Sequence, residues 1–249
     1  MKITSVNNDL VKETVKLQQK KYRSHTGQFL LEGYKAIKEA FDCGIELVRV
    51  FVNEKYLNEY TFIQDEIIET TDVVLKKLST TDSAPEAVAV GIQKDYDTKL
   101  LNTAKKVVLL ENIKDLGNLG TIIRSSLAFG ADALILYGDS VDIYNPKCVR
   151  ASVGNLWKLP IYHFREIADL KDNFANYERV ATLPRSNNLL RAYKAKMPVL
   201  VMFGSEADGL SDDLIEFSTD SVKIEMAKTV ESLNLATSVS VILYQLFVD

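Results

Sequence analysis

Short apolar runs alternate with amphipathic stretches along the second half of the chain. The runs are rich in valine, leucine and isoleucine, and each is short enough to form a single strand. This composition and length predict buried β-strands. The predicted strands lie at 107–111, 133–137, 179–183, 198–203 and 221–226.

Stretches with helical spacing of apolar residues separate these strands. The predicted helices lie near 119–129, 146–156, 165–175, 211–217 and 230–247. Because a buried strand followed by a helix recurs along the chain, the pattern predicts an α/β fold with a mainly parallel sheet. Ligands of such sheets bind beyond the carboxyl ends of the strands.

The first third of the chain shows a smaller pattern of the same kind. Its predicted elements are a strand at 29–33, a helix at 34–43 ended by Gly44, a strand at 47–53, a helix at about 72–79 and a strand at 87–94. The polar stretch 95–105 then loses the strand pattern, which marks a domain boundary. We therefore expect two domains, at 1–95 and 105–249.

The composition is that of a globular protein. Of 249 residues, 47% are hydrophobic and 26% are charged, which excludes a disordered or collagen-like chain. The two cysteines, Cys43 and Cys148, cannot build a disulfide framework, so a reduced, cytoplasmic location is expected. The sequence shows neither a signal peptide nor an apolar run of about 20 residues, so we expect no membrane association.

Metal and nucleotide-phosphate sites are poorly supported by the sequence. Neither His25 nor His163 lies near a cysteine at zinc-ligand spacing, so no metal is expected. Gly117 and Gly120 follow a strand, but they match neither the G-x-G-x-x-G pattern nor a P-loop. A nucleotide-binding α/β enzyme of that kind is therefore disfavoured.

Positive charge is concentrated at the start of the chain. Residues 1–38 contain eight lysines and arginines and three acidic residues, a net charge of +5, whereas the whole chain carries −4. Such a basic segment is suited to a polyanion, and Lys20, Lys21 and Arg23 are its candidate RNA-binding residues. The alternative is the solvated face of an amphipathic helix, whose apolar positions would be Val11, Val15 and Leu17.

Three polar segments follow predicted strands or precede a predicted helix. The first, 111–126, places Asn118 and Arg124 nearly two helical turns apart; the second, 203–214, places Glu206 between two glycines. The third, 224–238, places Glu231, Ser232 and Asn234 where the last helix is predicted to begin. Taken singly, Ser232 or Thr229 is readily explained as a helix cap. Taken together at one sheet edge, the three segments predict a binding site.

These segments resemble the three signature motifs of the SpoU/TrmH family of RNA ribose methyltransferases, in the SPOUT superfamily. The matching positions are Asn118 and Arg124 in the first motif, Gly204, Glu206, Gly209 and Leu210 in the second, and Glu231, Ser232, Leu233 and Asn234 in the third. The stretch 145–160 is also family-like, and 20–33 resembles the family's ribosomal-protein-like substrate-binding domain. The resemblance implies a knotted (trefoil-knot) parallel-sheet methyltransferase domain after a small α/β RNA-binding domain.

The resemblance also implies an activity, the transfer of a methyl group from S-adenosylmethionine to a ribose 2′-hydroxyl. The expected RNA is 23S ribosomal RNA; the alternatives are a transfer RNA, or a non-catalytic RNA-binding module of the same fold. Arg124 would serve the hydroxyl, either as its base or as an electrostatic stabiliser, although arginine normally keeps its proton. Asn118 and Asn234 would orient Arg124 and the substrate. Glu206 would hold the polar network of the site, and Ser232 would lie near the reacting ribose.

Cofactor contacts and assembly follow from the same resemblance. The implied cofactor-binding positions are Gly204, Ile224, Met226 and Leu233. The last predicted helix is apolar on almost all sides, so a homodimer is expected to cover part of it, through Leu243 or Leu246. The alternative is a helix packed wholly inside one domain.

The chain departs from the family pattern at four positions. Glu225 and Leu116 each stand where proline is usual, Lys228 where glycine is common and Ala236 where serine is common. These changes leave the named functional positions intact.

Overall fold

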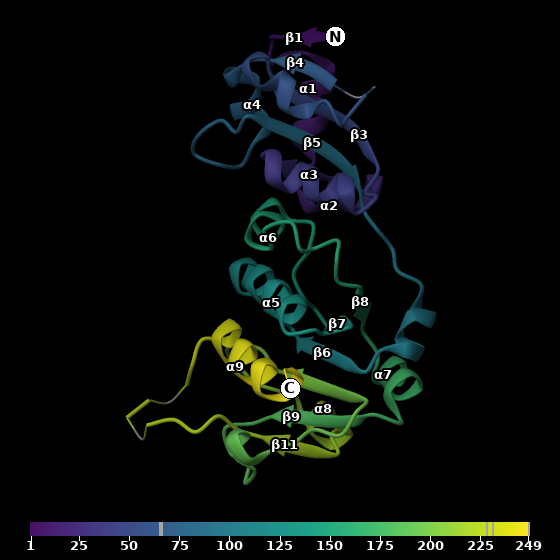
Figure 1. Cartoon of the computed structure of the whole chain (residues 1–249), viewed down its shortest axis with the longest axis vertical. Coiled ribbons are helices and arrows are strands. Elements are labelled where there is room, and N and C mark those ends of the chain that lie inside the picture. Colours follow the sequence, from purple (N-terminus) through teal and green to yellow (C-terminus); the bar gives the residue numbers. More distant parts are fainter. Residues whose placement is uncertain (65–66, 228, 231, 249) are drawn as a thin grey trace. The chain divides into compact units, whose positions relative to one another are not determined.

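The chain folds into two compact units. The computed structural model describes residues 1–64, 67–227, 229–230 and 232–248. Unit 1 consists of Met1–Asp95 and Asp142–Trp157, and unit 2 of Tyr96–Val141 and Lys158–Asp249 (Figure 1). The inserted segment, Asp142–Trp157, thus packs with the first unit although it comes from the second half of the chain.

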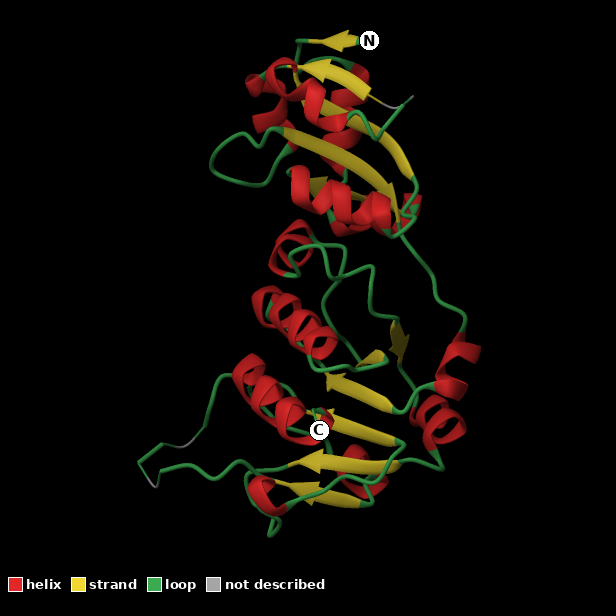
Figure 2. Cartoon of the chain, viewed as in Figure 1, coloured by secondary structure: helices red, strands yellow, loops and turns green. Residues whose placement is uncertain are grey.

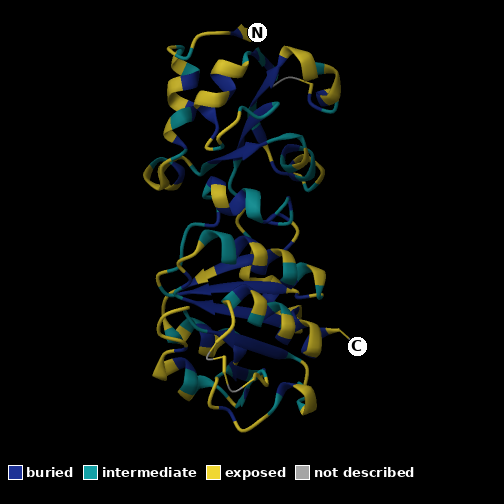
Figure 3. Ribbon diagram, turned by 90° about the vertical axis from the view of Figure 1, so that its left-hand side faces the viewer, coloured by how far each residue is buried: buried dark blue, intermediate teal, exposed yellow. Residues whose placement is uncertain are grey.

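Unit 2 is built on a parallel sheet. Within the described residues, six strands lie in the order β11-β9-β10-β6-β7-β8. They are β6 (Lys106–Glu111), β7 (Ala133–Tyr137), β8 (Ile161–Phe164), β9 (Glu178–Thr182), β10 (Val199–Phe203) and β11 (Asp220–Val222). The central strands are buried along almost their whole length (Figure 3), as expected for a parallel sheet covered on both faces.

Helices cover both faces of this sheet (Figure 2). The elements are η2 (Thr98–Thr103), α5 (Leu116–Ala128), α7 (Ile167–Phe174), η3 (Leu190–Ala192), α8 (Asp212–Phe217) and α9 (Leu235–Phe247). Strand residues such as Leu109 and Met202 pack with Phe174 of α7 and Leu214 of α8. α5 and α9 pack against each other.

Unit 1 contains a mixed sheet. In the described part of this unit, five strands lie in the order β1-β4-β3-β5-β2; β1, β4 and β3 run parallel, and β5 is antiparallel to β3 and β2. The strands are β1 (Lys2–Ile3), β2 (Gln28–Glu32), β3 (Leu47–Asn53), β4 (Ile67–Thr70) and β5 (Ala87–Ile92). The helices are α1 (Asp9–Lys16), α2 (Lys20–Thr26), α3 (Tyr34–Asp42), η1 (Glu54–Tyr60), α4 (Asp72–Leu78) and α6 (Pro146–Ala151).

Aromatic contacts hold the inserted segment in unit 1. The ring of Phe29, on β2, has its centroid 4.8 Å from that of Tyr144 and 5.3 Å from that of Trp157. Cys148 on α6 is fully buried, and burial raises the pKa of its thiol to about 12. The thiol therefore stays protonated at neutral pH and acts as a packing group.

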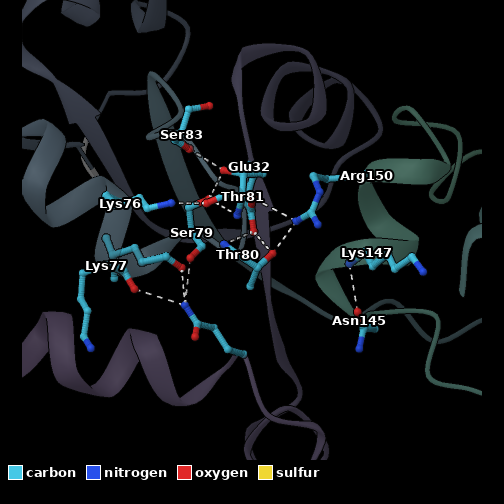
Figure 4. A network of polar contacts seen from close by, with 12 residues as sticks. Glu32, Lys76, Lys77, Ser79, Thr80, Thr81, Ser83, Asn145, Lys147 and Arg150 are labelled. Atoms are coloured by element: carbon cyan, nitrogen blue, oxygen red, sulfur yellow. Dashed lines mark hydrogen bonds and ion pairs between the residues drawn. The ribbon is translucent and has the colours of Figure 1, made fainter.

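A buried carboxylate fixes the same segment (Figure 4). Glu32, whose side chain is 3% exposed, accepts hydrogen bonds from Ser79 Oγ and from the backbone N–H and hydroxyl of Thr80. Arg150 of α6 completes the group, with its Nη1 3.1 Å from Glu32 Oε2. A buried charge is tolerated when it is paired and hydrogen-bonded in this way.

Several predicted boundaries are wrong. The last helix begins at Leu235 instead of residue 230, the helix expected at 146–156 ends at Ala151, and the last strand ends at Val222 instead of residue 226. β1, β4 and β8 were not predicted. Within the described residues, no helix is both long enough and apolar enough to cross a membrane.

Candidate active site

The first candidate motif lies where β6 ends and α5 begins. Asp115 is the N-cap of α5, and its carboxylate accepts a hydrogen bond from the backbone N–H of Asn118 at 2.7 Å. Leu116 occupies the first helical position, where proline is favoured in many helices. The cap satisfies a free donor of the helix and leaves the Asn118 side chain free for contacts outside it.

The second motif is a tight loop after β10. Ser205 and Gly209 exchange backbone hydrogen bonds of 3.1 Å, which close the loop around Glu206. Gly209 has φ +72°, and a Cβ on Gly204 would lie 1.9 Å from the carbonyl carbon of Gly209. Glycine is therefore required at position 204, because the backbone of Gly209 comes too close for a side chain, and it is favoured at position 209, because φ there is positive. The two glycines place Glu206 at the exposed end of the loop.

The third motif ends at α9. Asn234 is the N-cap of this helix, and its Oδ1 accepts a hydrogen bond from the backbone N–H of Thr237 at 3.2 Å. Ser232 lies two residues before the cap and is exposed, so it does not cap the helix. Glu231 and Lys228 lie outside the described residues.

Side chains from the three motifs are joined by hydrogen bonds. Asn234 Nδ2 donates to Asn118 Oδ1 at 3.0 Å, and Asn118 Nδ2 donates to Glu206 Oε1 at 2.9 Å. Residues 116 positions apart in the sequence are thus brought together at the carboxyl ends of β6 and β10. In this Asn234–Asn118–Glu206 series, the Asn118 side chain accepts a hydrogen bond through its oxygen and donates one through its nitrogen, which fixes the orientation of its amide. The series also holds the exposed carboxylate of Glu206 in place.

Two further contacts between the segments of unit 2 were not predicted. Glu111, the last residue of β6, is 4% exposed, and its carboxylate accepts a hydrogen bond from the backbone N–H of Ser211 at 2.8 Å. The hydroxyls of Ser125 on α5 and Ser240 on α9 lie 2.7 Å apart. The sequence did offer a signal for Glu111, because an acidic residue at the end of an apolar strand is unusual. It offered no signal for the contact between Ser125 and Ser240.

Arg124 lies on α5, beyond Asn118. Its side chain is exposed, and within the described residues it makes neither a hydrogen bond nor an ion pair. The structure therefore does not link Arg124 to the Asn234–Asn118–Glu206 series. It leaves a free guanidinium on the helix that begins at the site.

The predicted cofactor residues lie at Gly204 and on the connection between β11 and α9. The described part of this connection contains neither helix nor strand after residue 223 (Figure 1). Met226 is 36% and Leu233 39% exposed, while Ile224 is half-buried. Two apolar side chains thus stand uncovered close in sequence to the Asn234 cap.

The start of this connection borders a surface groove. The groove has a volume of about 390 Å³, and Ile224 is the predicted cofactor residue that lines it. Its lining residues are Leu190, Arg191, Ile224, Glu225, Ser240, Val241, Tyr244 and Gln245. Arg191 Nε lies 2.8 Å from Glu225 Oε1, so the glutamate that replaces the usual proline has a partner.

The predicted RNA-binding residues behave differently from one another. Lys20 and Lys21 are exposed on α2, whereas Arg23 is 1% exposed. Arg23 Nη2 lies 2.6 Å from Asp142 Oδ2, and its Nη1 donates to the Leu17 carbonyl at 2.8 Å. This placement contradicts a direct RNA contact by Arg23, because its guanidinium is buried and already paired. Arg23 instead joins α2 to the inserted segment.

Both units match known protein families. Residues 105–244 match the SpoU rRNA Methylase family, and residues 8–89 match the MRM3-like substrate binding domain. The chain is 32% identical to an uncharacterized tRNA/rRNA methyltransferase of Synechocystis sp., over 98% of this chain and 92% of the other. It is 27% identical to the 23S rRNA (guanosine(2553)-2′-O)-methyltransferase of Bacillus subtilis, over 98% of each chain.

Solved structures show the same architecture. An AdoMet-bound rRNA methyltransferase from Sinorhizobium meliloti superposes with a TM-score of 0.89 at 27% identity, over 98% of this chain and 96% of the other. The SpoU methyltransferase AviRb from Streptomyces viridochromogenes, in complex with AdoMet, gives a TM-score of 0.87 at 27% identity, over 96% and 97%. The predicted α/β class, with a small N-terminal domain and a parallel-sheet methyltransferase domain, is confirmed. Because residues 105–244 match the family and a relative 32% identical covers 98% of the chain, the protein belongs to the SpoU rRNA methylase family.

Proposed function

We propose that the protein methylates a ribose 2′-hydroxyl of large-subunit ribosomal RNA, with S-adenosylmethionine as the methyl donor. The observation that carries this proposal is the Asn234–Asn118–Glu206 series, because it joins one residue from each of the three motifs that resemble the family's signature. Relatives that match 98% of this chain are named as 23S rRNA 2′-O-methyltransferases. A cytoplasmic location is part of the proposal, because both cysteines are free, as in a reducing compartment.

The residues of the third motif suit the cofactor. When bound, S-adenosylmethionine supplies the methyl group, and the products are the 2′-O-methyl ribose, S-adenosylhomocysteine and the hydroxyl proton. Met226 and Leu233 offer apolar surface that the described chain leaves exposed, as an adenine ring would require. The bare backbone at Gly204 and the connection at Ile224 are the remaining proposed contacts.

We assign Arg124 to the acceptor hydroxyl. Arginine keeps its proton at any working pH, so a positive charge beside the 2′-oxygen would stabilise the alkoxide character that develops as the O–H proton leaves. The guanidinium is exposed and has no partner among the described residues, so it is available to the RNA. Asn118, held by Asn234 and Glu206, and Ser232, two residues before Asn234 in the sequence, would orient the ribose.

The function is tested with purified protein and two RNAs. We expect calorimetric binding of S-adenosylmethionine and transfer of its labelled methyl group to 23S rRNA transcribed in vitro, with a 2′-O-methyl nucleotide as the product. Transfer to tRNA alone would overturn the rRNA assignment. Cofactor binding without transfer to either RNA would indicate a non-catalytic RNA-binding module.

We also propose a homodimer formed through α9. Leu243 and Leu246, the residues expected at the interface, are 0% and 8% exposed within the single chain, so that expectation is wrong. Val241, Tyr244 and Val248 are instead 41%, 60% and 43% exposed. Val241 and Tyr244, three positions apart on α9, lie on one side of the helix axis as an apolar stripe that needs a cover, and Val248 follows them as the C-cap residue.

A charge on this stripe is expected to separate the dimer. The wild-type chain should scatter light as a species of about twice its 27.9 kDa mass, and Val241→Glu should shift it toward 27.9 kDa. Asn102→Glu, at an exposed position on η2, adds the same charge elsewhere and should leave the mass unchanged. A wild-type species at 27.9 kDa would contradict the proposal.

A further inference from the structure

Four exposed lysines lie at the ends of three helices in unit 1. Lys16 is in the last turn of α1, Lys20 and Lys21 are in the first turn of α2, and Lys77 is in the last turn of α4. We call them the lysine patch.

A single glutamine brings these helix ends together. Gln18 lies between α1 and α2, and its Nε2 donates to the carbonyl oxygens of Lys77, Leu78 and Ser79 at 3.2, 3.0 and 3.3 Å. Below this contact, α1 and α4 share a buried core that includes Val11 and Val74. Figure 4 shows Lys77 turned toward the neighbouring helix and away from the Glu32–Arg150 contact. The four lysines therefore share one region of the surface.

The charges of the patch have no carboxylate partner in the described part of the chain, and Lys16 Nζ lies 5.8 Å from the centroid of the Tyr22 ring. Nearby cations do have partners: Lys12 pairs with Asp9 at 3.4 Å, and Lys76 donates to the Thr81 carbonyl at 2.7 Å. Among the residues that the structure describes, none of the four patch lysines lies within ion-pair distance of a carboxylate. Gathering unpaired like charges is unfavourable in the free protein, and a bound polyanion would relieve it.

The stability of the helices explains the positions of two of the four patch lysines. Lys16 and Lys77 lie in last turns, where a cation favours the helix dipole. Lys20 and Lys21 lie in a first turn, where cations are unfavourable. That turn contains no acidic residue, and its cap residue Gln19 makes no side-chain cap. The positions of Lys20 and Lys21 thus call for an explanation outside the helix.

We propose that the lysine patch binds backbone phosphates of the RNA substrate, away from the nucleotide that is methylated. This rests on the proposed function for the identity of the RNA. Lysine side chains bind phosphates as point charges without reading the bases, so the patch would add affinity more than sequence specificity. Arg23 is a positioning residue here, because its bonds to Asp142 and to the Leu17 carbonyl hold α2 in place.

The test removes two patch lysines from different helices. Lys20→Gln/Lys77→Gln should weaken binding to in vitro transcribed 23S rRNA by about 10-fold at moderate salt, and should lower the slope of log K against log[KCl] by about one to two. The KM for RNA should rise while kcat and the affinity for S-adenosylmethionine stay unchanged, because no patch residue belongs to the proposed catalytic site.

A matched control separates position from net charge. Lys2→Gln/Lys38→Gln removes two lysines of the same unit, but Lys2 is paired with Glu54 and Glu69, and Lys38 with Asp42. We expect this variant to bind RNA within about threefold of wild type, with an unchanged salt slope.

The outcomes distinguish the patch from the proposed function. Equal RNA affinity and salt slope for the patch and control variants, with wild-type methyl transfer intact, would overturn the patch alone. A patch-dependent salt slope in a protein that methylates no RNA would support the patch and overturn the function. Patch-dependent binding to phosphatidylserine vesicles, without an effect on RNA, would assign the patch to a membrane surface and overturn the proposal.

Discussion

Arg124→Ala is expected to lower the rate of methyl transfer by about 10²–10⁴-fold, while the affinity for S-adenosylmethionine stays within a few-fold of wild type. Removal of one preorganised charge that stabilises a developing oxyanion has effects of this size. The cofactor affinity should persist because Arg124 lies on α5, whereas the proposed cofactor residues lie at Gly204 and on the connection after β11. Single-turnover methyl transfer and calorimetry measure the two quantities separately.

Two further variants sharpen the assignment of Arg124. Arg124→Lys retains the charge but loses the planar fork, so a partial recovery of rate would identify electrostatic stabilisation as the main effect. Arg165→Ala removes another exposed arginine of unit 2 and should have near-wild-type kinetics. Near-wild-type turnover of Arg124→Ala itself would remove the residue from the mechanism.

Gly204→Ala should abolish most of the activity by a different route. The new Cβ would meet the carbonyl carbon of Gly209 at 1.9 Å and the backbone nitrogen of Leu210 at 2.1 Å, so the loop must open. Opening the loop moves Glu206 away from Asn118 and releases the Asn234–Asn118–Glu206 series. We expect a loss of kcat of about 100-fold or more, because small misplacements of positioning groups are costly.

Cofactor affinity distinguishes this loop defect from the loss of Arg124. Gly204→Ala should also weaken S-adenosylmethionine binding, since Gly204 is a proposed cofactor contact, and should lower the melting temperature. Ala207→Ser changes an exposed residue of the same loop and should be close to wild type in all three measurements. Wild-type kinetics for Gly204→Ala would show that the spacing of the two glycines is not needed for the site.

The parallel sheet of unit 2 was predictable because burial on both faces makes its strands continuously apolar. β8 was missed since Ile161–Phe164 is short, follows Pro160 and contains the exposed His163. The start of α9 was misplaced because Val230 and Leu233 extend its apolar pattern, although both side chains are exposed. There the hydrogen bond of the Asn234 cap, and not the apolar pattern, decides where the helix begins.

The candidate site shows a similar division. Motif spacing singled out Asn118, Glu206 and Asn234, but it carried no information on which atoms bond. Arg23 was misread because its partner, Asp142, lies 119 residues away in the sequence. The local sequence of a basic cluster does not show whether one of its residues is buried against a distant carboxylate or whether all of them are free to bind RNA.

The inserted segment has a consequence for the order in which the chain folds during synthesis. Residues 1–95 leave the ribosome before residues 142–157, but among the described residues Phe29, Arg23 and Glu32 have aromatic or charged partners in Asp142–Trp157. Domains generally fold as units as they emerge. The N-terminal unit therefore cannot reach its final packing until residue 157 has been made, when β6 and β7 of the second unit have already been synthesised. Transplanting this unit onto another methyltransferase would require both pieces of chain.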